Sequence, residues 1–327
     1  MMSSTIRGKR EKNLGAWPIR YVRPQLVLFE SRKKFAFLYC LATITGLFCV
    51  PGVVNALSTA DFDLFAIVRM SLPLPIASLL VTAGTYILND LVDADLDKAN
   101  GKKRPIPSGL VSKKQALSFV ALTFGSAILL TSITFSLISL VIISLMVGIG
   151  IMYSFPKIAL MKRFVIKTAS IAIFYILCAL LGMTSVYNLD LALESPMQVV
   201  IVLLTLAIMV FISSTLNDMG DFDGDKSAGR RTIPIVIGKE KTIRLMTILA
   251  ATVLLLTWGL YGAALATGKG SLIAALATTS IALLVLLTMI RMRKSLHNAE
   301  FMRSQHKKLF PLQMAMHPAL ILSIVIL

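Results

Sequence analysis

Long apolar stretches, each near the length needed to cross a lipid bilayer, recur along the whole chain of 327 residues. A membrane-spanning helix needs about 20 mostly apolar residues. Only 15% of the residues are charged, whereas a soluble domain has about 25%, so the composition excludes an ordinary soluble protein. We therefore predict an all-α fold, a polytopic membrane bundle of nine transmembrane helices. They are expected at 35–55, 64–88, 114–133, 134–153, 165–187, 198–216, 244–265, 271–290 and 309–327.

Positive charge falls on one side of this predicted bundle. All but two of the 33 lysine and arginine residues lie in the N-terminal segment or in alternate loops, the exceptions being Arg69 and Lys269. Loops rich in lysine and arginine stay in the cytoplasm. The N-terminus and the loops 89–114 and 217–244 are therefore predicted to be cytoplasmic, and nine crossings place Leu327 on the opposite side of the cell membrane.

The same pattern suggests two regions of unequal size. Residues 1–34 form a basic cytoplasmic segment that we expect at the membrane surface, and residues 35–327 form a single transmembrane domain. A net charge of +17 could suit a nucleic-acid partner. Its confinement to one side of a membrane bundle instead follows the positive-inside rule, so we predict no nucleic-acid partner.

One ten-residue pattern occurs twice, each time at the end of an apolar stretch. It reads N-D-x-x-D-x-D-x-D-K at 89–98 and again at 217–226, and the two copies hold half of the 16 acidic residues. A basic R-x-I-P element follows each copy, at 104–107 and at 231–234. Carboxylates are strongly disfavoured beside hydrocarbon, so matched clusters at two helix ends indicate a functional site.

If each copy continues its helix, three of its aspartates, at positions i, i+3 and i+7, share one face. Asp95 and Asp223 project elsewhere. Three close carboxylates repel one another and lose hydration, which a hard divalent cation relieves. Mg²⁺ prefers one or two carboxylates with waters and phosphate oxygens, so we expect two Mg²⁺ ions that leave positions open for a diphosphate. The predicted metal ligands and catalytic carboxylates are Asp90, Asp93, Asp97, Asp218, Asp221 and Asp225.

Polar and basic residues next to the two motifs are predicted to bind the diphosphate. Arginine suits phosphate because its planar fork donates two hydrogen bonds at once, and an asparagine lies on the edge of each carboxylate face. These residues are Asn89, Lys102, Arg104, Asn217, Arg230 and Arg231. The plain alternative is a pair of solvated loops in which aspartate and lysine balance each other, but it does not explain two copies with the same spacing.

The two motifs and the apolar pattern resemble those of the UbiA superfamily of intramembrane prenyltransferases, over roughly residues 35–327. The resemblance rests on Asn-Asp-x-x-Asp-x-x-x-Asp at 89–97 and Asp-x-x-Asp-x-x-x-Asp at 218–225. It implies a helical bundle around a central cavity open to lipid, with cytoplasmic loops that carry the motifs. It also implies Mg²⁺-dependent transfer of a prenyl group from a polyprenyl diphosphate to an acceptor.

The resemblance extends to a Tyr-Ser-x-Pro segment at 153–156. It implies that the ring of Tyr153 steadies the allylic carbocation, and that Lys157 or Lys162 binds the diphosphate. An interfacial aromatic anchor is the alternative for Tyr153.

Segments 97–112 and 224–234 are similar to archaeal digeranylgeranylglyceryl phosphate synthases, which implies a geranylgeranyl donor and geranylgeranylglyceryl phosphate as the lipid acceptor. The chain departs from the family at 23–26, where Arg-Pro-x-Asn lacks its asparagine, and at 167–168, where Lys-Thr replaces Gly-Asn. Two other functions stay open: an aromatic prenyltransferase of quinone or tetrapyrrole pathways, for example on 4-hydroxybenzoate, and a divalent-cation transporter.

Overall fold

The computed structural model describes residues 17–50, 72–99, 103–184, 196–266 and 270–325, and all regular structure in these residues is helical. The long helices are α2 (Trp17–Phe48), α5 (Pro73–Val92), α7 (Lys113–Ser132), α8 (Leu137–Ser154), α9 (Phe164–Met183), α11 (Pro196–Gly220), α14 (Lys239–Ala266), α15 (Leu272–Met292) and α16 (Ala299–Val325). Shorter helical segments are α6 (Ala94–Ala99), η1 (Leu160–Lys162), α12 (Phe222–Ser227), α13 (Ile233–Ile237) and η2 (Arg293–Ser295).

Within the described residues, seven helices are long and apolar enough to cross a membrane: α5, α7, α8, α9, α11, α14 and α15 with η2. The all-α membrane fold predicted from the sequence is therefore confirmed. The helices α2 and α16 are not among the seven. Helix α2 covers most of the span predicted at 35–55, of which residues 51–55 lie outside the described residues. Helix α16 contains Gln313 and His317 among its apolar residues. The count of nine crossings stays a prediction.

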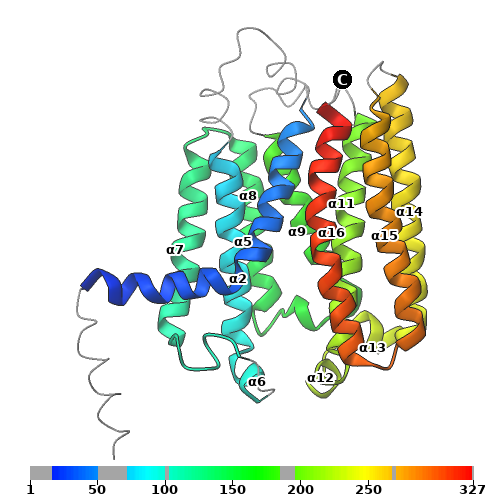
Figure 1. Cartoon of the computed structure of the whole chain (residues 1–327). Coiled ribbons are helices and arrows are strands. Elements are labelled where there is room, and N and C mark those ends of the chain that lie inside the picture. Colours follow the sequence, from blue (N-terminus) through cyan, green and yellow to red (C-terminus); the bar gives the residue numbers. More distant parts are fainter. Residues whose placement is uncertain (1–16, 51–71, 100–102, 185–195, 267–269, 326–327) are drawn as a thin grey trace, which may run out of the picture.

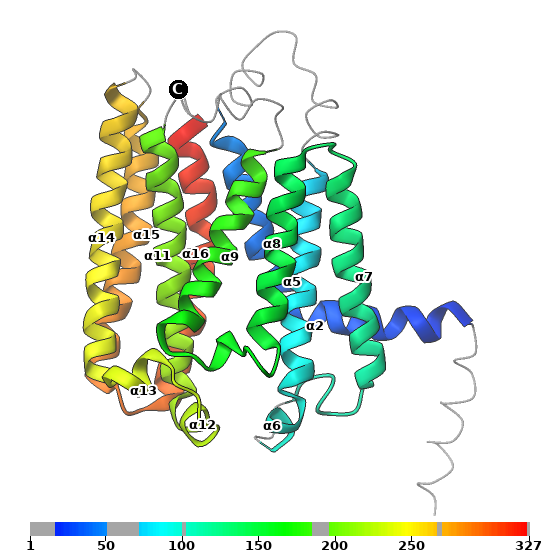
Figure 2. The same ribbon diagram turned by 180° about the vertical axis from the view of Figure 1, so that it is seen from behind.

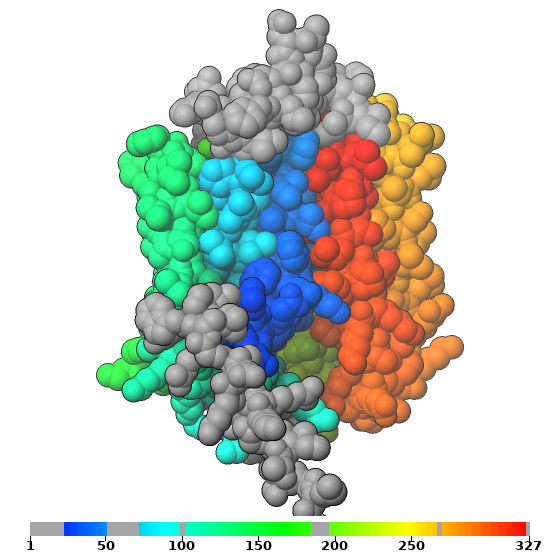
Figure 3. Space-filling view, turned by 60° about the vertical axis from the view of Figure 1, so that its left-hand side comes forward, coloured from blue at the N-terminus to red at the C-terminus, as the bar shows by residue number. Residues whose placement is uncertain are grey.

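The long helices form two groups joined by α2, α9 and α16 (Figures 1 and 2). Helix α5 packs against α7, α8 and α2, and α11 packs against α14, α16 and α9. Helices α2 and α9 pack together in the middle, and α2 and α16 lie side by side on the face seen in Figure 3. The first part of α2 runs crosswise to the long helices and projects outward past α7 (Figure 1). The short helices α6 and α12 are at the end of the bundle opposite the C-terminal end of α16. This arrangement brings the two acidic motifs to one end.

Two glycines allow α2 and α9 to approach each other closely. A Cβ atom at Gly46 would overlap the backbone carbonyl of Ala179, and one at Gly182 would overlap that of Thr43. In lipid no hydrophobic driving force holds two helices together. Small residues stabilise such crossings because they allow close van der Waals packing of the backbones. His317 of α16 joins this helix to both α2 and α9. Its ring nitrogens lie 2.8 Å from Thr45 Oγ1 and 2.6 Å from the Tyr175 hydroxyl.

We expect Gly182→Ala to destabilise the protein, because the added methyl group would overlap backbone on α2, which would have to shift. Overpacking of this kind costs about 1–3 kcal/mol. Thermal unfolding of the purified protein in detergent measures the effect. Gly125→Ala on α7 is the matched control, since nothing lies within 4 Å of its added Cβ. Equal melting temperatures for the two variants would contradict close packing of α2 against α9.

Candidate active site

Both acidic motifs interrupt their helices at the same position, the middle aspartate. Helix α5 ends at Val92 and α6 follows, with Asp93 between them at φ −84° and ψ 2°. Helix α11 ends at Gly220 and α12 follows, with Asp221 at φ −103° and ψ 14°. The prediction of one continuous helix is thus wrong at this residue. The helical register nevertheless continues, because Asp97 N–H donates to Asp93 O at 2.8 Å and Asp225 N–H to Asp221 O at 2.9 Å.

The two motifs face a common cavity of about 230 Å³. The aspartates that we expected on one face of each motif are called here the first triad (Asp90, Asp93 and Asp97) and the second triad (Asp218, Asp221 and Asp225). All of them except Asp97 line the cavity. Asp97 lies beside it and is only 1% exposed. Other lining residues come from α2, α8, α9 and α16, so the site joins both halves of the bundle: Arg32, Tyr39, Tyr153, Lys167, His306 and Gln313.

Guanidinium groups surround the first triad. Arg32 holds both carboxylate oxygens of Asp90, with its Nε 2.7 Å from Oδ2. Arg104 lies 2.7 Å from Asp90 Oδ1 and 2.5 Å from Asp97 Oδ2. Asp93 accepts hydrogen bonds from Asn89 at 3.1 Å and from Arg230 at 2.7 Å. All three carboxylates therefore have a close basic partner.

In the second triad Asp218 has a close basic partner, whereas the arginine contacts of Asp221 and Asp225 are longer. Lys167 on α9 pairs with Asp218 Oδ1, while Asp218 Oδ2 is buried and has no hydrogen-bond partner. Asp221 lies 3.3 Å from Arg303, and Asp225 lies 3.4 Å from Arg230.

Arg230 connects the two triads, because it follows the second motif and yet donates to Asp93 of the first. Burial disfavours the charge of its guanidinium, but the carboxylates of Asp93 and Asp225 outweigh burial and raise the pKa of Arg230. The arginine therefore stays charged between the two motifs.

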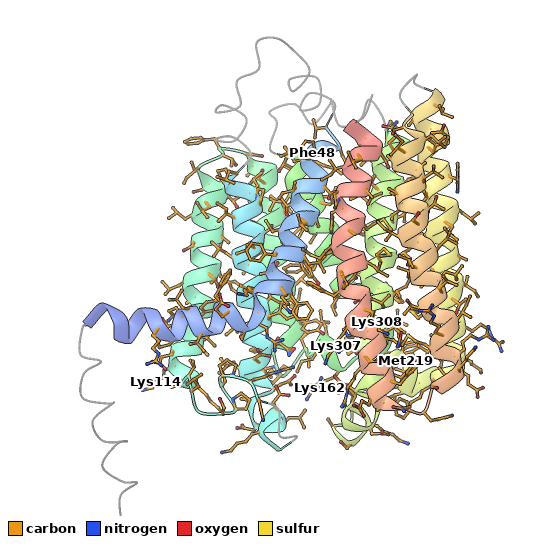
Figure 4. The ribbon with its side chains drawn as sticks, in the orientation of Figure 1. Phe48, Lys114, Lys162, Met219, Lys307 and Lys308 are labelled. Carbon is orange, nitrogen blue, oxygen red and sulfur yellow. The ribbon has the colours of Figure 1, made fainter. Side chains whose placement is uncertain are left out.

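Some of the basic residues predicted to bind diphosphate lie away from the cavity. Lys157, Lys162 and Arg231 are exposed and do not line it. The backbone N–H of Arg231 donates to the carbonyl of Lys162 at 3.0 Å, which ties these two loops together. Lys162 is at the same end of the bundle as Lys307 and Lys308 of α16 (Figure 4). Lys102 lies outside the described residues.

Asn89, Asn217 and Tyr153 line the cavity as the sequence suggested. Tyr153 also lines a smaller cavity of about 80 Å³, between α5, α8 and α9, whose other aromatic residues include Tyr39, Tyr86 and Phe174. The smaller cavity shares Tyr39, Tyr86 and Tyr153 with the charged one. The larger, charged cavity therefore adjoins the smaller one, which is called here the aromatic chamber.

Two charged cavity residues, Arg32 and Lys167, were missed as site residues by the sequence analysis. Each is a basic residue close to the start of an apolar segment, where a charge that snorkels to the interface is the ordinary interpretation. Lys167 is only 7% exposed, so it does not snorkel. Its place where relatives have glycine was the only sequence signal.

The donor set suits Mg²⁺ bound together with phosphate. Among the described residues, no three aspartate, glutamate, histidine or cysteine side chains are close enough to hold a metal ion by themselves. Mg²⁺ does not need such a cage, since it takes one or two carboxylates and fills the remaining positions with water and phosphate. Asp218 lines the cavity, and its buried Oδ2 has no hydrogen-bond partner, so this carboxylate is a candidate ligand of the required kind.

The chain is similar to proteins of one known family. The model of the UbiA prenyltransferase family matches residues 40–310. Digeranylgeranylglyceryl phosphate synthase of Methanoculleus marisnigri is 28% identical over 203 residues, which are 62% of this chain and 66% of that protein. The synthase of Saccharolobus solfataricus is 30% identical over 54% of this chain and 60% of its own length. The matches thus span 60–66% of the length of these two curated relatives.

Solved structures share the fold. A structure of digeranylgeranylglyceryl phosphate synthase in membranes aligns with a TM-score of 0.67 and 20% identity, over 94% of this chain and 100% of that one. A UbiA homologue from Archaeoglobus fulgidus, bound to GPP and Mg²⁺, aligns with a TM-score of 0.61 and 15% identity, over 91% of this chain and 99% of that one. At these identities the likeness establishes the fold alone.

Proposed function

Because the chain belongs to the UbiA prenyltransferase family, we propose that it transfers a geranylgeranyl group from its diphosphate to geranylgeranylglyceryl phosphate, in the synthesis of membrane ether lipids. The observation that carries the proposal is the cavity in which two aspartate motifs and their basic partners face each other beside an aromatic chamber. The relatives named as digeranylgeranylglyceryl phosphate synthases support this acceptor.

Mg²⁺ is the proposed cofactor, supported by the solved relatives that contain Mg²⁺ with GPP or DMAPP. We propose two ions, held by the first and second triads together with the diphosphate. When bound, Mg²⁺ would neutralise charge that develops on the departing diphosphate. The roles of the six triad aspartates as metal ligands remain part of the proposal.

The chain's own residues account for the other steps. Arg104 and Arg230 already lie among the carboxylates, so they are placed to donate hydrogen bonds to diphosphate oxygens once phosphate and metal share the cavity. The bond between C1 of the prenyl chain and the diphosphate oxygen breaks, and its electron pair leaves with the diphosphate. The rings of Tyr39, Tyr86 and Tyr153 face the resulting allylic cation. The glycerol hydroxyl oxygen then bonds to C1, and its proton passes to the departed diphosphate.

The membrane arrangement forms part of the same proposal. Nine crossings and a central cavity open to lipid would let an isoprenoid tail enter from the bilayer and would keep water from quenching the cation. Residues 1–34 would lie at the cytoplasmic surface of the cell membrane, residues 35–327 would form the transmembrane domain, and the motifs would be cytoplasmic. The basic end of the bundle, with Lys162, Lys307 and Lys308, supports this orientation.

The test is transfer of label from radioactive geranylgeranyl diphosphate by the purified protein in detergent. Geranylgeranylglyceryl phosphate and 4-hydroxybenzoate are offered in parallel, with Mg²⁺ and with excess EDTA. We expect Mg²⁺-dependent labelling of the glyceryl phosphate only. Labelling of the aromatic acid would move the protein to the aromatic branch of the family. Labelling that persists in EDTA would contradict the role of Mg²⁺, and no labelling of either compound would contradict the proposed acceptor.

A further inference from the structure

The internal duplication extends beyond the aspartates to the cations that hold them. The first aspartate of each triad pairs with a basic residue on the long helix that precedes and packs against its own helix. Arg32 of α2 holds Asp90 of α5, and Lys167 of α9 holds Asp218 of α11. The separations along the chain are similar, 58 and 51 residues. The two halves of the site are therefore built on one plan.

Arg104 and Arg230, called here the loop arginines, do not follow this symmetry. Arg104 follows the first motif and stays with its own triad, where it bonds Asp90 and Asp97. Arg230 follows the second motif but lies closer to Asp93 of the first triad, at 2.7 Å, than to Asp225 of its own, at 3.4 Å. Both loop arginines thus compensate mainly the first triad.

The two triads consequently differ in how far their charge is already compensated. Guanidinium groups lie within 2.7 Å of every carboxylate of the first triad. In the second triad an ammonium pairs with Asp218, and the guanidinium contacts of Asp221 with Arg303 and of Asp225 with Arg230 are longer than 3 Å. Asp218 is 1% exposed, yet its Oδ2 has no partner and the residue lines the cavity. A buried carboxylate oxygen left without a donor is costly, and a cation that binds there relieves that cost.

We propose that the two metal sites fill in order: a first divalent cation binds the second triad through Asp218 in the absence of substrate, and a second cation binds the first triad only together with the diphosphate. This inference rests on the proposed function for the identity of the ligands. The diphosphate would draw Arg104 and Arg230 away from the aspartates onto its own oxygens, because charged hydrogen bonds to phosphate are strong. The freed carboxylates of Asp90 and Asp93 could then accept a metal ion.

Metal binding without turnover tests the order. Mn²⁺ suits the same carboxylate ligands, and electron paramagnetic resonance counts the ions bound to the full-length protein in detergent. We expect one Mn²⁺ per chain, displaced by Mg²⁺, and two when inorganic diphosphate is added. Asp218→Asn should lose the diphosphate-independent ion, while Asp90→Asn should keep it. Two ions or none in the substrate-free protein, or loss of the ion in Asp90→Asn alone, would overturn the order.

A variant that is expected to gain an ion distinguishes ordered metal binding from loss of binding through misfolding. Replacing both guanidinium partners of Asp90, in Arg32→Gln with Arg104→Gln, should let a second Mn²⁺ bind without diphosphate. A count that stays at one in this variant would contradict the idea that arginines keep the first triad closed. The proposed function fails separately, because it predicts transfer to an acceptor, whereas these counts require neither acceptor nor prenyl chain.

Discussion

Prenyl transfer is expected to fall by about a thousandfold when Asp90 or Asp218 is replaced by asparagine. Each substitution removes one negative charge from a motif with little change of shape, so metal and diphosphate lose a ligand at the point where charge develops. Metal stabilisation of that charge is worth several kcal/mol, and each 1.36 kcal/mol is a factor of ten in rate. Initial rates of label transfer from geranylgeranyl diphosphate, at saturating Mg²⁺, measure the loss.

The chain supplies its own control for this experiment. Asp95 and Asp223 belong to the same two motifs but are exposed and lie outside the cavity. Asp95 pairs with Lys113 at the surface, and such pairs contribute little. Asp95→Asn and Asp223→Asn should therefore keep near wild-type rates. Rates for Asp90→Asn and Asp218→Asn that match those of these controls would contradict a metal role for the two motifs.

The sequence was sufficient to predict the acidic half of the site. Helical spacing selects three aspartates in each motif and rejects Asp95 and Asp223, and five of the six selected residues line one cavity. The prediction succeeds because a period of 3.6 residues decides which side chains share a face. The break at the middle aspartate does not disturb it, since the hydrogen bonds from Asp97 and Asp225 keep the register.

The basic half of the site could be predicted only in part: Arg104 and Arg230 line the cavity as suggested, but other basic residues do not follow from the sequence. Nearness in sequence suggested Arg231, yet its side chain is exposed, whereas Arg32 reaches Asp90 from another helix 58 residues away. How the helices pack together depends on contacts such as those of Gly46 and Gly182 between α2 and α9, and periodicity carries no information about them. Lys157 and Lys162 were suggested by resemblance alone, and both are exposed and lie outside the cavity.

Replacing Lys167 by methionine is expected to destabilise the protein by about 3–5 kcal/mol, because it leaves the Asp218 carboxylate buried without its partner. The side chains of Lys167 and Asp218 are only 9% and 1% exposed, so the carboxylate has little hydration to replace the lost ammonium. We expect the midpoint of thermal unfolding in detergent to fall by about 10 °C. Lys33→Met is the matched control, since Lys33 pairs with Glu30 at the surface and both side chains are more than one-third exposed.

The double variant Lys167→Met with Asp218→Asn decides whether this loss comes from the stranded charge. Asp218→Asn alone leaves the ammonium of Lys167 unpaired and should also lower the midpoint, whereas removal of both charges is often close to neutral. We therefore expect the double variant to unfold near the wild-type temperature and yet to remain inactive, because the Asp218 carboxylate is absent. Additive losses in the double variant would show that the pair is not coupled. A stable and active double variant would exclude Asp218 from the reaction.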